Sequence, residues 1–384
     1  MELKLRAGMI GGGKGAFIGA VHRIGLNMDG LIELSCGALS QNPETAKESG
    51  RALFLPEHRI YTSYKELFEK ESRLPEDQRI HFVSVVTPNF AHFEPAMLAL
   101  DHGFHVVIDK PMTLTLDEAK QLKQKVDETG LLLALTHTYA SYPMVKQAKK
   151  MVADGVLGSI RKIYVEYPQG WLSQLSEKEG NKQASWRTDP AKSGKAGCMG
   201  DIGTHAAHLA EYISGQKITQ LCASLNIVVP GRQLDDDGAM LLRFDKGATG
   251  VLIASQVAAG EENDLKIRMY GEKGGLEWHQ QEPNTLILKW ADAPAQIYRT
   301  GNGYLSDIAK FNTRTPGGHP EGYLEAFANI YRNFALALVA KMKGEQPDPL
   351  IDFPTVDDGV RGMAFIENVV AASASDKKWW DLVV

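Results

Sequence analysis

The N-terminal segment constrains the fold most, because a short apolar run ends in a glycine cluster and continues into a helix-compatible stretch. Residues 5–10 form the run, residues 11–15 read Gly-Gly-Gly-Lys-Gly, and residues 16–26 form the stretch. Strand, tight turn and helix in this order are typical of a nucleotide-binding unit. The pattern G-x-G-x-x-A fits Gly11, Gly13 and Ala16, where positive backbone angles and a close approach to pyrophosphate require glycine. The helix that follows, beginning with Phe17 and Ile18, offers free N–H groups to that anion.

A glycine-rich surface turn is the alternative for this segment. A second strand, predicted at residues 32–39, follows at the interval of a βαβ unit and favours dinucleotide binding. A phosphate loop is excluded because Lys14 is followed by glycine and not by Ser or Thr. Ser40 stands where an acidic residue normally holds the ribose hydroxyls, and no arginine follows it directly. We therefore expect NAD as the cofactor and leave NADP open.

Strands and helices continue to alternate through the first part of the chain. The pattern predicts strands at 81–87, 104–109 and 131–135 and helices at 90–101 and 116–129. Such alternation predicts a doubly wound parallel sheet, a Rossmann domain over residues 1–138. Ligands bind beyond the carboxyl ends of parallel strands. The residues expected at that edge are Thr87, Pro88, Asn89, Asp109, Lys110 and His137.

From about residue 160 the pattern changes to strands with few helices between them. The predicted strands are 160–167, 218–228, 239–244, 249–255, 265–270 and 276–278. Turn sequences at 245–247 and 271–274 predict hairpins. The fold class is therefore α/β: a Rossmann domain plus an α+β domain, residues 139–384, with a large open, mostly antiparallel sheet. The final helix, 355–373, is a candidate to pack back on the first domain, and the open sheet predicts a homodimer or homotetramer.

Composition excludes several functions. The net charge of −5 is small and the charges are interspersed, so the basic stripe of a nucleic-acid-binding protein is missing. No apolar run approaches membrane-spanning length, and the N-terminus lacks the order of a signal peptide. Three widely spaced cysteines predict neither disulfides nor structural zinc. We expect a cytoplasmic protein with a small-molecule substrate, no membrane and no nucleic acid.

Asp201 and His205 stand four residues apart at the start of a predicted helix, residues 202–213. This spacing places both side chains on one face, where a carboxylate can orient an imidazole for general-base work near neutral pH. A capping aspartate beside an incidental histidine explains the spacing equally well. A metal site with His208 is less favoured, because no second cluster of ligands supports it. We expect no metal.

Two loops carry further candidate residues. A polar insertion at 168–200 contains Trp171, Trp186 and Arg187, and long loops of this kind are functional or disordered. Trp186 and Arg187 favour function, with tryptophans that only anchor the loop as the alternative. His319 precedes a predicted helix that runs to about residue 341, where it contacts substrate or satisfies loop backbone groups.

Together these motifs make the chain resemble the Gfo/Idh/MocA oxidoreductases over essentially its full length. The resemblance rests on the order of five motifs: the Gly11 to Ala16 turn, Thr87-Pro88-Asn89 with His92, Lys110-Pro111, Asp201 with His205, and Asp358-Gly359. It implies hydride transfer between a nicotinamide and a secondary alcohol of a sugar, glycoside or inositol.

The resemblance also implies roles for individual residues. Lys110 would hydrogen-bond the reacting oxygen and the cofactor, His205 would take the alcohol proton, and Asp201 would orient the site. The expected cofactor contacts are Gly11, Gly13, Ala16, Phe17, Ile18, Ser40, Thr87, Pro88, Asn89, His92, Asp109, Lys110, His137, Trp186 and Arg187. The expected substrate contacts are Lys110, Trp171, Asp201, His205 and His319.

Two departures from the family pattern are visible. Many members have Glu before the lysine, whereas this chain has Asp109, and the acid near Ser40 is missing. Two other functions stay open: a keto-sugar-processing enzyme that recycles a tightly bound nicotinamide, and a non-catalytic dinucleotide-binding sensor.

Overall fold

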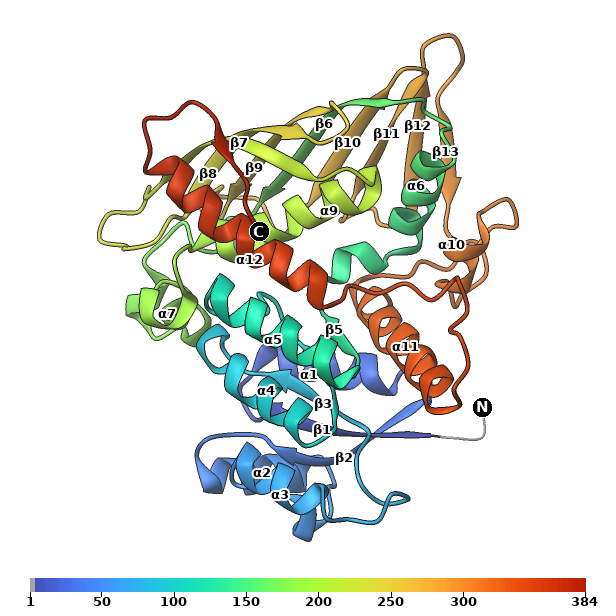
Figure 1. Ribbon diagram of the computed structural model, residues 1–384. Coiled ribbons are helices and arrows are strands. Elements are labelled where there is room, and N and C mark those ends of the chain that lie inside the picture. The colour runs from blue at the N-terminus through green and yellow to red at the C-terminus, as the bar shows by residue number, and fades with distance from the viewer. Residues whose placement is uncertain (1–3) are drawn as a thin grey trace. The chain divides into compact units, whose positions relative to one another are not determined.

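The computed structural model describes residues 4–384 and divides the chain into two compact units (Figure 1). The first unit contains the chain up to Thr138 together with Tyr323–Val360, and the second contains Tyr139–Gly322 and Arg361–Val384. The segment 323–360 thus groups with the first unit, although we assigned it to the second domain and named only the final helix as a candidate to return.

The first unit is built around a five-stranded sheet of order β2-β1-β3-β4-β5, in which every pairing is parallel. This confirms the predicted Rossmann sheet. Two helices lie between β2 and β3, and we predicted bounds for neither. The elements of this unit are β1 (Leu5–Gly11), α1 (Phe17–Asn27), β2 (Ile32–Ala38), α2 (Pro43–Ala52), η1 (Glu57–Arg59), α3 (Tyr64–Glu71), β3 (Phe82–Val86), η2 (Asn89–Ala91), α4 (Phe93–Asp101), β4 (His105–Ile108), α5 (Leu116–Thr129), β5 (Leu133–Leu135) and α11 (Tyr323–Met342), with the start of α12 (Val356–Ser373).

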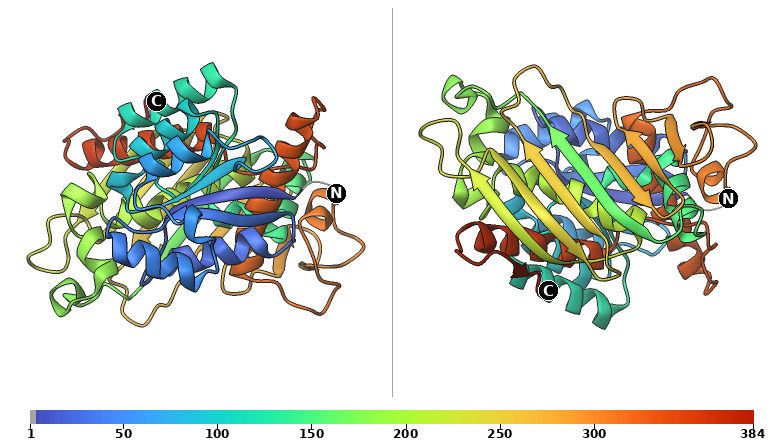
Figure 2. Two further views of the ribbon diagram at one scale, coloured as in Figure 1. Left: turned by 90° about the horizontal axis from the view of Figure 1, so that it is seen from below. Right: turned by 90° about the horizontal axis from the view of Figure 1, so that it is seen from above.

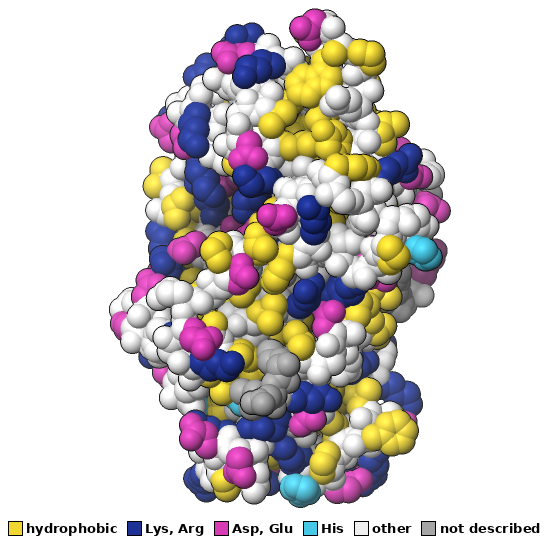
Figure 3. Space-filling view, turned by 90° about the vertical axis from the view of Figure 1, so that its right-hand side faces the viewer, with side chains coloured by type: hydrophobic (Ala, Val, Ile, Leu, Met, Phe, Trp, Pro, Cys, Tyr) yellow, Lys and Arg dark blue, Asp and Glu magenta, His cyan; other side chains and the backbone are white. Residues whose placement is uncertain are grey.

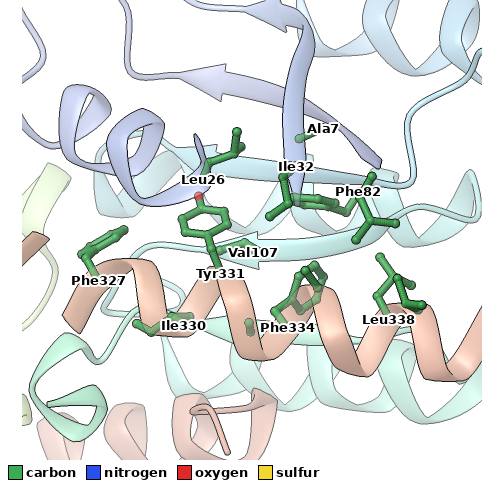
Figure 4. Close-up of a cluster of buried hydrophobic side chains, with 14 of the residues drawn as sticks. Ala7, Leu26, Ile32, Phe82, Val107, Phe327, Ile330, Tyr331, Phe334 and Leu338 are labelled. Carbon is green, nitrogen blue, oxygen red and sulfur yellow. The ribbon is translucent and has the colours of Figure 1, made fainter. Parts of the chain in front are cut away.

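Helix α11 closes the core of this unit. Phe327, Tyr331, Phe334 and Leu338 follow one another at helical spacing, so they share one face of α11. All four are buried in one hydrophobic cluster with side chains from β1, α1, β2, β3 and β4 (Figure 4). The segment that completes the first core therefore lies about two hundred residues after β5 in the sequence.

The second unit contains a nine-stranded sheet of order β13-β12-β11-β10-β6-β9-β8-β7-β14. All its pairings are antiparallel except that of β6 with β9, which confirms the predicted sheet and both predicted hairpins. The elements are α6 (Pro143–Ala153), β6 (Ile160–Pro168), η4 (Ser176–Glu179), α7 (Lys182–Arg187), α8 (Pro190–Ser193), η5 (Met199–Gly203), α9 (Thr204–Ser214), β7 (Ile218–Asn226), β8 (Asp237–Phe244), β9 (Thr249–Ser255), β10 (Lys266–Gly271), β11 (Gly274–His279), β12 (Thr285–Trp290), β13 (Gln296–Arg299), α10 (Asp307–Phe311) and β14 (Trp380–Asp381), with η3 (Thr138–Ser141) at its start.

The two faces of this sheet differ. Helices α6 and α9 pack on one face, and the strands of the other face lie open toward the viewer in the right-hand view of Figure 2. Side chains alternate along β8 and β9, so that Leu241 and Ile253 lie on the open face and are 47% and 40% exposed. The register joins a row of side chains across this face: Cys222, Leu241, Val251, Tyr164, Arg268, Glu277, Ile287 and Ile297.

The surface carries no single-sign stripe in the view of Figure 3, where acidic and basic side chains of the described residues are interspersed. Among residues 4–384, no helix is both long enough and apolar enough to cross a membrane.

Candidate functional site

The glycine turn after β1 brings three chain segments into close contact. Gly11 has a φ of +77°, and a Cβ there would lie 2.4 Å from the carbonyl oxygen of Val86 in β3. A Cβ on Gly13 would lie 2.5 Å from the carbonyl oxygen of Leu39, just after β2. Both positions therefore require glycine, as the sequence predicted.

The residue of α1 that lies closest to the turn is Gly19, whereas the motif placed this contact at Ala16. Ala16 is the N-cap residue of α1, and Phe17, the first residue of the helix, is 68% exposed. Gly19 instead meets the turn: a Cβ on it would lie 2.1 Å from the carbonyl oxygen of Gly12. The close approach of the helix to the turn thus occurs at Gly19, three residues after the motif position Ala16. Gly19 was visible as a glycine inside a helical stretch, but we did not use it.

The segment after β2 shows how the predicted ribose region is held. The Ser40 hydroxyl accepts a hydrogen bond from the Asn42 backbone N–H (3.1 Å), and the Asn42 side chain caps α2. The two cations of α2 both face carboxylates: Lys47 Nζ lies 3.4 Å from Glu44, and the Arg51 guanidinium lies 2.7 Å from Glu57.

His92 connects the loops that follow β3 and β4. Its Nε2 lies 2.7 Å from the carbonyl oxygen of Thr87, and its Nδ1 lies 2.8 Å from that of Pro111. The ring is almost completely buried. Thr87-Pro88-Asn89 and Lys110-Pro111, two motifs from separate loops, are therefore joined through one side chain.

Asp109 shapes the turn that carries Lys110. Its Oδ1 accepts the backbone N–H of Lys110 (3.0 Å) and the hydroxyl of Thr136 (2.6 Å), which follows β5. The Lys110–Pro111 peptide bond is cis. His137, the next residue after Thr136, is buried. One carboxylate oxygen thus ties the ends of β4 and β5 together beside the lysine.

Asp201 and His205 lie in the second unit, whereas Lys110 lies in the first. The predicted helix at 202–213 is corrected by the structure: a π-helical segment, Met199–Gly203, precedes α9 (Thr204–Ser214). Asp201 lies inside this π segment, a feature that is frequent at functional sites. Its Oδ2 accepts hydrogen bonds from Gln256 Nε2 (2.9 Å) and from Arg187 Nε (3.2 Å).

His205 is buried against two tyrosines. Its ring centroid lies 4.8 Å from that of Tyr139 and 6.3 Å from that of Tyr167. The two tyrosine hydroxyls contact each other, and Asn263 bonds both, donating to Tyr139 (3.2 Å) and accepting from Tyr167 (2.8 Å). Burial raises the pKa of Tyr139, so its hydroxyl keeps its proton. An imidazole held in this way has few alternative orientations.

Arg187 links Asp201 to both tryptophans of the insertion. Its guanidinium lies 4.1 Å from the centre of the Trp186 ring and 5.8 Å from the Trp171 ring. Trp171 is 36% exposed, and its indole N–H donates to Gln169 (2.9 Å). Three candidate residues of the insertion are therefore gathered beside Asp201, and α7 and α8 give the insertion ordered structure.

His319 lies elsewhere in the second unit. It is exposed and lines a separate cavity of about 360 Å³, which Asp201, His205 and Trp171 do not line. The cavity is lined by Asn284, Arg299, Thr300, Asn302, Gly318, His319 and Pro320. The role of His319 as a substrate contact stays a prediction.

Sequence reasoning missed five residues of the Asp201 and His205 cluster: Tyr139, Tyr167, Gln169, Gln256 and Asn263. They come from η3, the end of β6 and the loop after β9, and no motif contains them. Only the fold brings them together. Among residues 4–384, no three His, Cys, Asp or Glu side chains are grouped as metal ligands.

Comparisons with known proteins find similarity over both parts of the chain. Residues 5–137 match the family model described as "Oxidoreductase family, NAD-binding Rossmann fold", and residues 145–277 match the "GFO/IDH/MocA C-terminal domain". An uncharacterised oxidoreductase, YfiI of Bacillus subtilis, is 31% identical over 98% of this chain and 96% of its own length. Levoglucosan dehydrogenase of Pseudarthrobacter phenanthrenivorans is 26% identical over 76% of this chain and 77% of its own.

Among solved structures, an inositol dehydrogenase homolog from Azotobacter vinelandii in complex with NAD+ is 34% identical, with a TM-score of 0.95. The match covers 99% of this chain and 98% of that chain. The same homolog has also been solved with NADH and myo-inositol, at 33% identity and a TM-score of 0.92.

Proposed function

Because the chain belongs to the Gfo/Idh/MocA family of oxidoreductases, whose NAD-binding Rossmann domain it carries, we propose that it oxidises a secondary alcohol of a sugar, glycoside or inositol. The hydride passes to the nicotinamide, and the reverse reaction reduces the ketone. The observation that carries this proposal is the buried His205, held by two tyrosines next to an Asp201 that is itself held by Gln256 and Arg187.

Each catalytic residue has a separate task in the proposed reaction. His205 accepts the alcohol proton, because a neutral imidazole is a base near neutral pH. Lys110 donates a hydrogen bond to the same oxygen and stabilises the negative charge that develops on it. Asp201 orients the polar groups around the alcohol. The bound nicotinamide supplies the hydride acceptor.

NAD is the cofactor that the segment after β2 favours over NADP. Lys47 and Arg51 are the cations that follow Ser40 most closely in the sequence. Lys47 already faces Glu44, and Arg51 already faces Glu57. A 2'-phosphate would have to compete with these carboxylates, whereas a ribose hydroxyl would not.

A carbohydrate or cyclic polyol is the substrate class that the second unit favours. Trp171 offers an apolar ring face of the kind that stacks on sugar rings, next to the amides of Gln169 and Gln256. The names of the similar levoglucosan dehydrogenase and inositol dehydrogenase homolog support the same substrate class, since they point to sugar and polyol chemistry.

The test is to measure reduction of NAD and NADP over a panel of inositols, monosaccharides, glycosides and anhydrosugars. We expect turnover of at least one of them, with kcat about a hundredfold or more lower in His205→Ala and Lys110→Ala. NADH binding, followed by fluorescence, is expected to survive in His205→Ala. Undiminished turnover in both variants contradicts the assignment. NADH binding without turnover of any compound would instead indicate a sensor.

We also propose that the open face of the large sheet joins copies of this chain into a homodimer or homotetramer. The support is the exposed apolar side chains of that face, with Leu241 and Ile253 on neighbouring strands. We propose the cytoplasm as the compartment, because Cys36 and Cys198 are buried free thiols and Cys222 is also unpaired with another cysteine.

A further inference from the structure

A line of buried polar side chains lies beneath the Lys110 turn and takes no part in the reaction described above. The Ser84 hydroxyl lies 2.8 Å from the Tyr331 hydroxyl, which lies 2.7 Å from His22 Nδ1. His22 Nε2 in turn lies 4.0 Å from Asp109 Oδ2. Ser84, Tyr331 and His22 are all fully buried. They come from β3, α11 and α1, so no sequence motif contains them.

His22 Nε2 is the exceptional atom of this line. Within residues 4–384 it has no hydrogen-bond partner, although it is shielded from solvent. A buried polar group without a partner is costly and requires an explanation. Asp109 Oδ2 is an acceptor close to it, and a shift of about 1 Å would bring the two atoms to hydrogen-bond distance.

The rest of the line allows the ring proton of His22 to lie on Nε2. Burial lowers the pKa of His22 to about 4, while the charge of Asp109 opposes this shift, so the ring is neutral at pH 7. Ser84 can donate to Tyr331, and Tyr331 can then donate to Nδ1. With the donors in this order, the single ring proton lies on Nε2, the nitrogen that faces Asp109.

We propose that His22 is a positioning residue for Lys110, donating from Nε2 to Asp109 Oδ2 in the working enzyme. Asp109 Oδ1 is occupied by the Lys110 N–H and by Thr136, so Oδ2 is the oxygen that remains for this bond. The bond fixes the carboxylate and, with it, the turn that carries the lysine.

The other groups whose charge acts on His22 are His92 and Arg23. The inference rests on the proposed function, because Lys110 matters only if it contacts the reacting oxygen.

Two substitutions separate positioning from packing. His22→Gln keeps an N–H near the position of Nε2, whereas His22→Leu keeps the approximate volume and removes the donor. We expect kcat to fall about tenfold in His22→Leu and to be largely retained in His22→Gln, with the KM for NAD unchanged in both. A purely structural role would instead change stability and NADH binding, with no rescue by glutamine.

A second readout needs no substrate. The rate at which a lysine-selective reagent modifies Lys110 is measured by mass spectrometry, with the exposed Lys65 as internal standard. We expect this rate to rise about threefold in His22→Leu, because the turn is less restrained, and to stay near that of the wild type in His22→Gln. Since no alcohol is present, this result stands even if the proposed function fails, and absence of turnover in the wild type would reveal that failure separately.

His105→Leu is the matched control, because it removes a mostly buried histidine from the other end of β4 and is expected to leave Lys110 modification unchanged. If His22→Leu does not fold, Tyr331→Phe tests the same line, since it removes the hydroxyl that directs the ring proton. An unchanged modification rate of Lys110 in the variant that folds, or equal behaviour of His22→Leu and His22→Gln, overturns the proposal.

Discussion

At the scale of single residues, buried histidines make the first unit sensitive to acid. The pKa of His22 is lowered from 6.5 to about 4 by burial, and burial lowers those of His81 and His105 to about 4 as well. At a pH between about 4 and 6.5, these histidines bind protons in the unfolded chain but not in the folded chain. Stability is therefore fully present above about pH 6.5 and is lost as the pH falls toward 4.

His22 allows this pH dependence to be measured. A fully buried histidine with this shift contributes about 2 kcal/mol to the loss of stability between pH 7 and pH 5. Urea titrations at pH 7 and at pH 5 give the free energy of unfolding at each pH. We expect its fall from pH 7 to pH 5 to be smaller in His22→Gln than in the wild type, by about 2 kcal/mol. Equal losses in the two proteins would contradict the prediction. Exposed His58 provides the control, because His58→Gln should leave the pH dependence unchanged.

Glu71 is a second residue whose removal should be severe. The carboxylate is fully buried, where it accepts two hydrogen bonds from Arg59 (2.9 and 2.6 Å), one from Tyr61 (2.7 Å) and one from the Ile80 N–H (3.3 Å). Glu71→Ala leaves a partly buried guanidinium without its carboxylate, so we expect a loss of about 3 to 5 kcal/mol in the free energy of unfolding. Glu69→Ala, an exposed neighbour on α3, should cost little by the same measurement. A loss below about 1 kcal/mol in Glu71→Ala would show that the cluster is dispensable.

At the scale of elements, Asp235 holds the start of the helical segment formed by η5, which carries Asp201, and α9, which carries His205. One oxygen of this carboxylate accepts the Gly197 N–H and the other accepts the Met199 N–H, both at 2.7 Å. These are the donors that a helix start leaves unsatisfied. The clamp therefore fixes where the π segment begins.

Asp235→Ala should disturb catalysis more than cofactor binding. We expect kcat to fall about tenfold because the helix start loosens, while NADH affinity in the first unit is retained. The neighbouring Asp237→Ala is the control, since that carboxylate accepts an exposed bond from Asn226 (3.1 Å) and does not hold the helix start. Equal kcat values for both variants would argue against the clamp. Measurement requires only turnover rates and NADH fluorescence titrations.

Gly19 offers a test of the turn in the first unit. Gly19→Ala places a Cβ 2.1 Å from the Gly12 carbonyl oxygen, so α1 must move away from the turn. We expect NADH affinity to fall about tenfold or more, because the helix N-terminus no longer faces the pyrophosphate correctly. Gly303→Ala, which has open space around it, should bind NADH normally. Unchanged affinity in Gly19→Ala would contradict the role given to this contact.

The same elements show what the sequence could and could not predict. All five strands of the first sheet were predicted, because buried strands and glycine turns leave local patterns. The position of Gly19 was missed because the turn is longer than the standard motif. The Asp201 and His205 pair was singled out by its spacing, but Gln256 and Asn263 were not singled out. Their roles depend on contacts between segments that are distant in the chain, and such contacts leave no local pattern.

At the scale of the whole molecule, the open sheet face predicts assembly. Leu241→Asp combined with Ile253→Asp places charges within an apolar part of this face, so we expect smaller species in sedimentation velocity than the wild type forms. Ile24→Asp, at a similarly exposed apolar position on α1, is the control and should leave the assembly unchanged. An unchanged sedimentation profile in the double variant would show that this face does not join subunits.

The return of α11 to the first unit has a consequence for the order of folding during synthesis. When residue 138 has left the ribosome, all five strands of the first sheet exist, but Phe327, Tyr331 and Phe334 have not yet been made. The sheet then exposes the apolar surface that these side chains later cover. Synthesis of the first unit begins before that of the second but is completed only after nearly all of the second unit has emerged. The nascent chain therefore exposes this surface while the second unit is being translated.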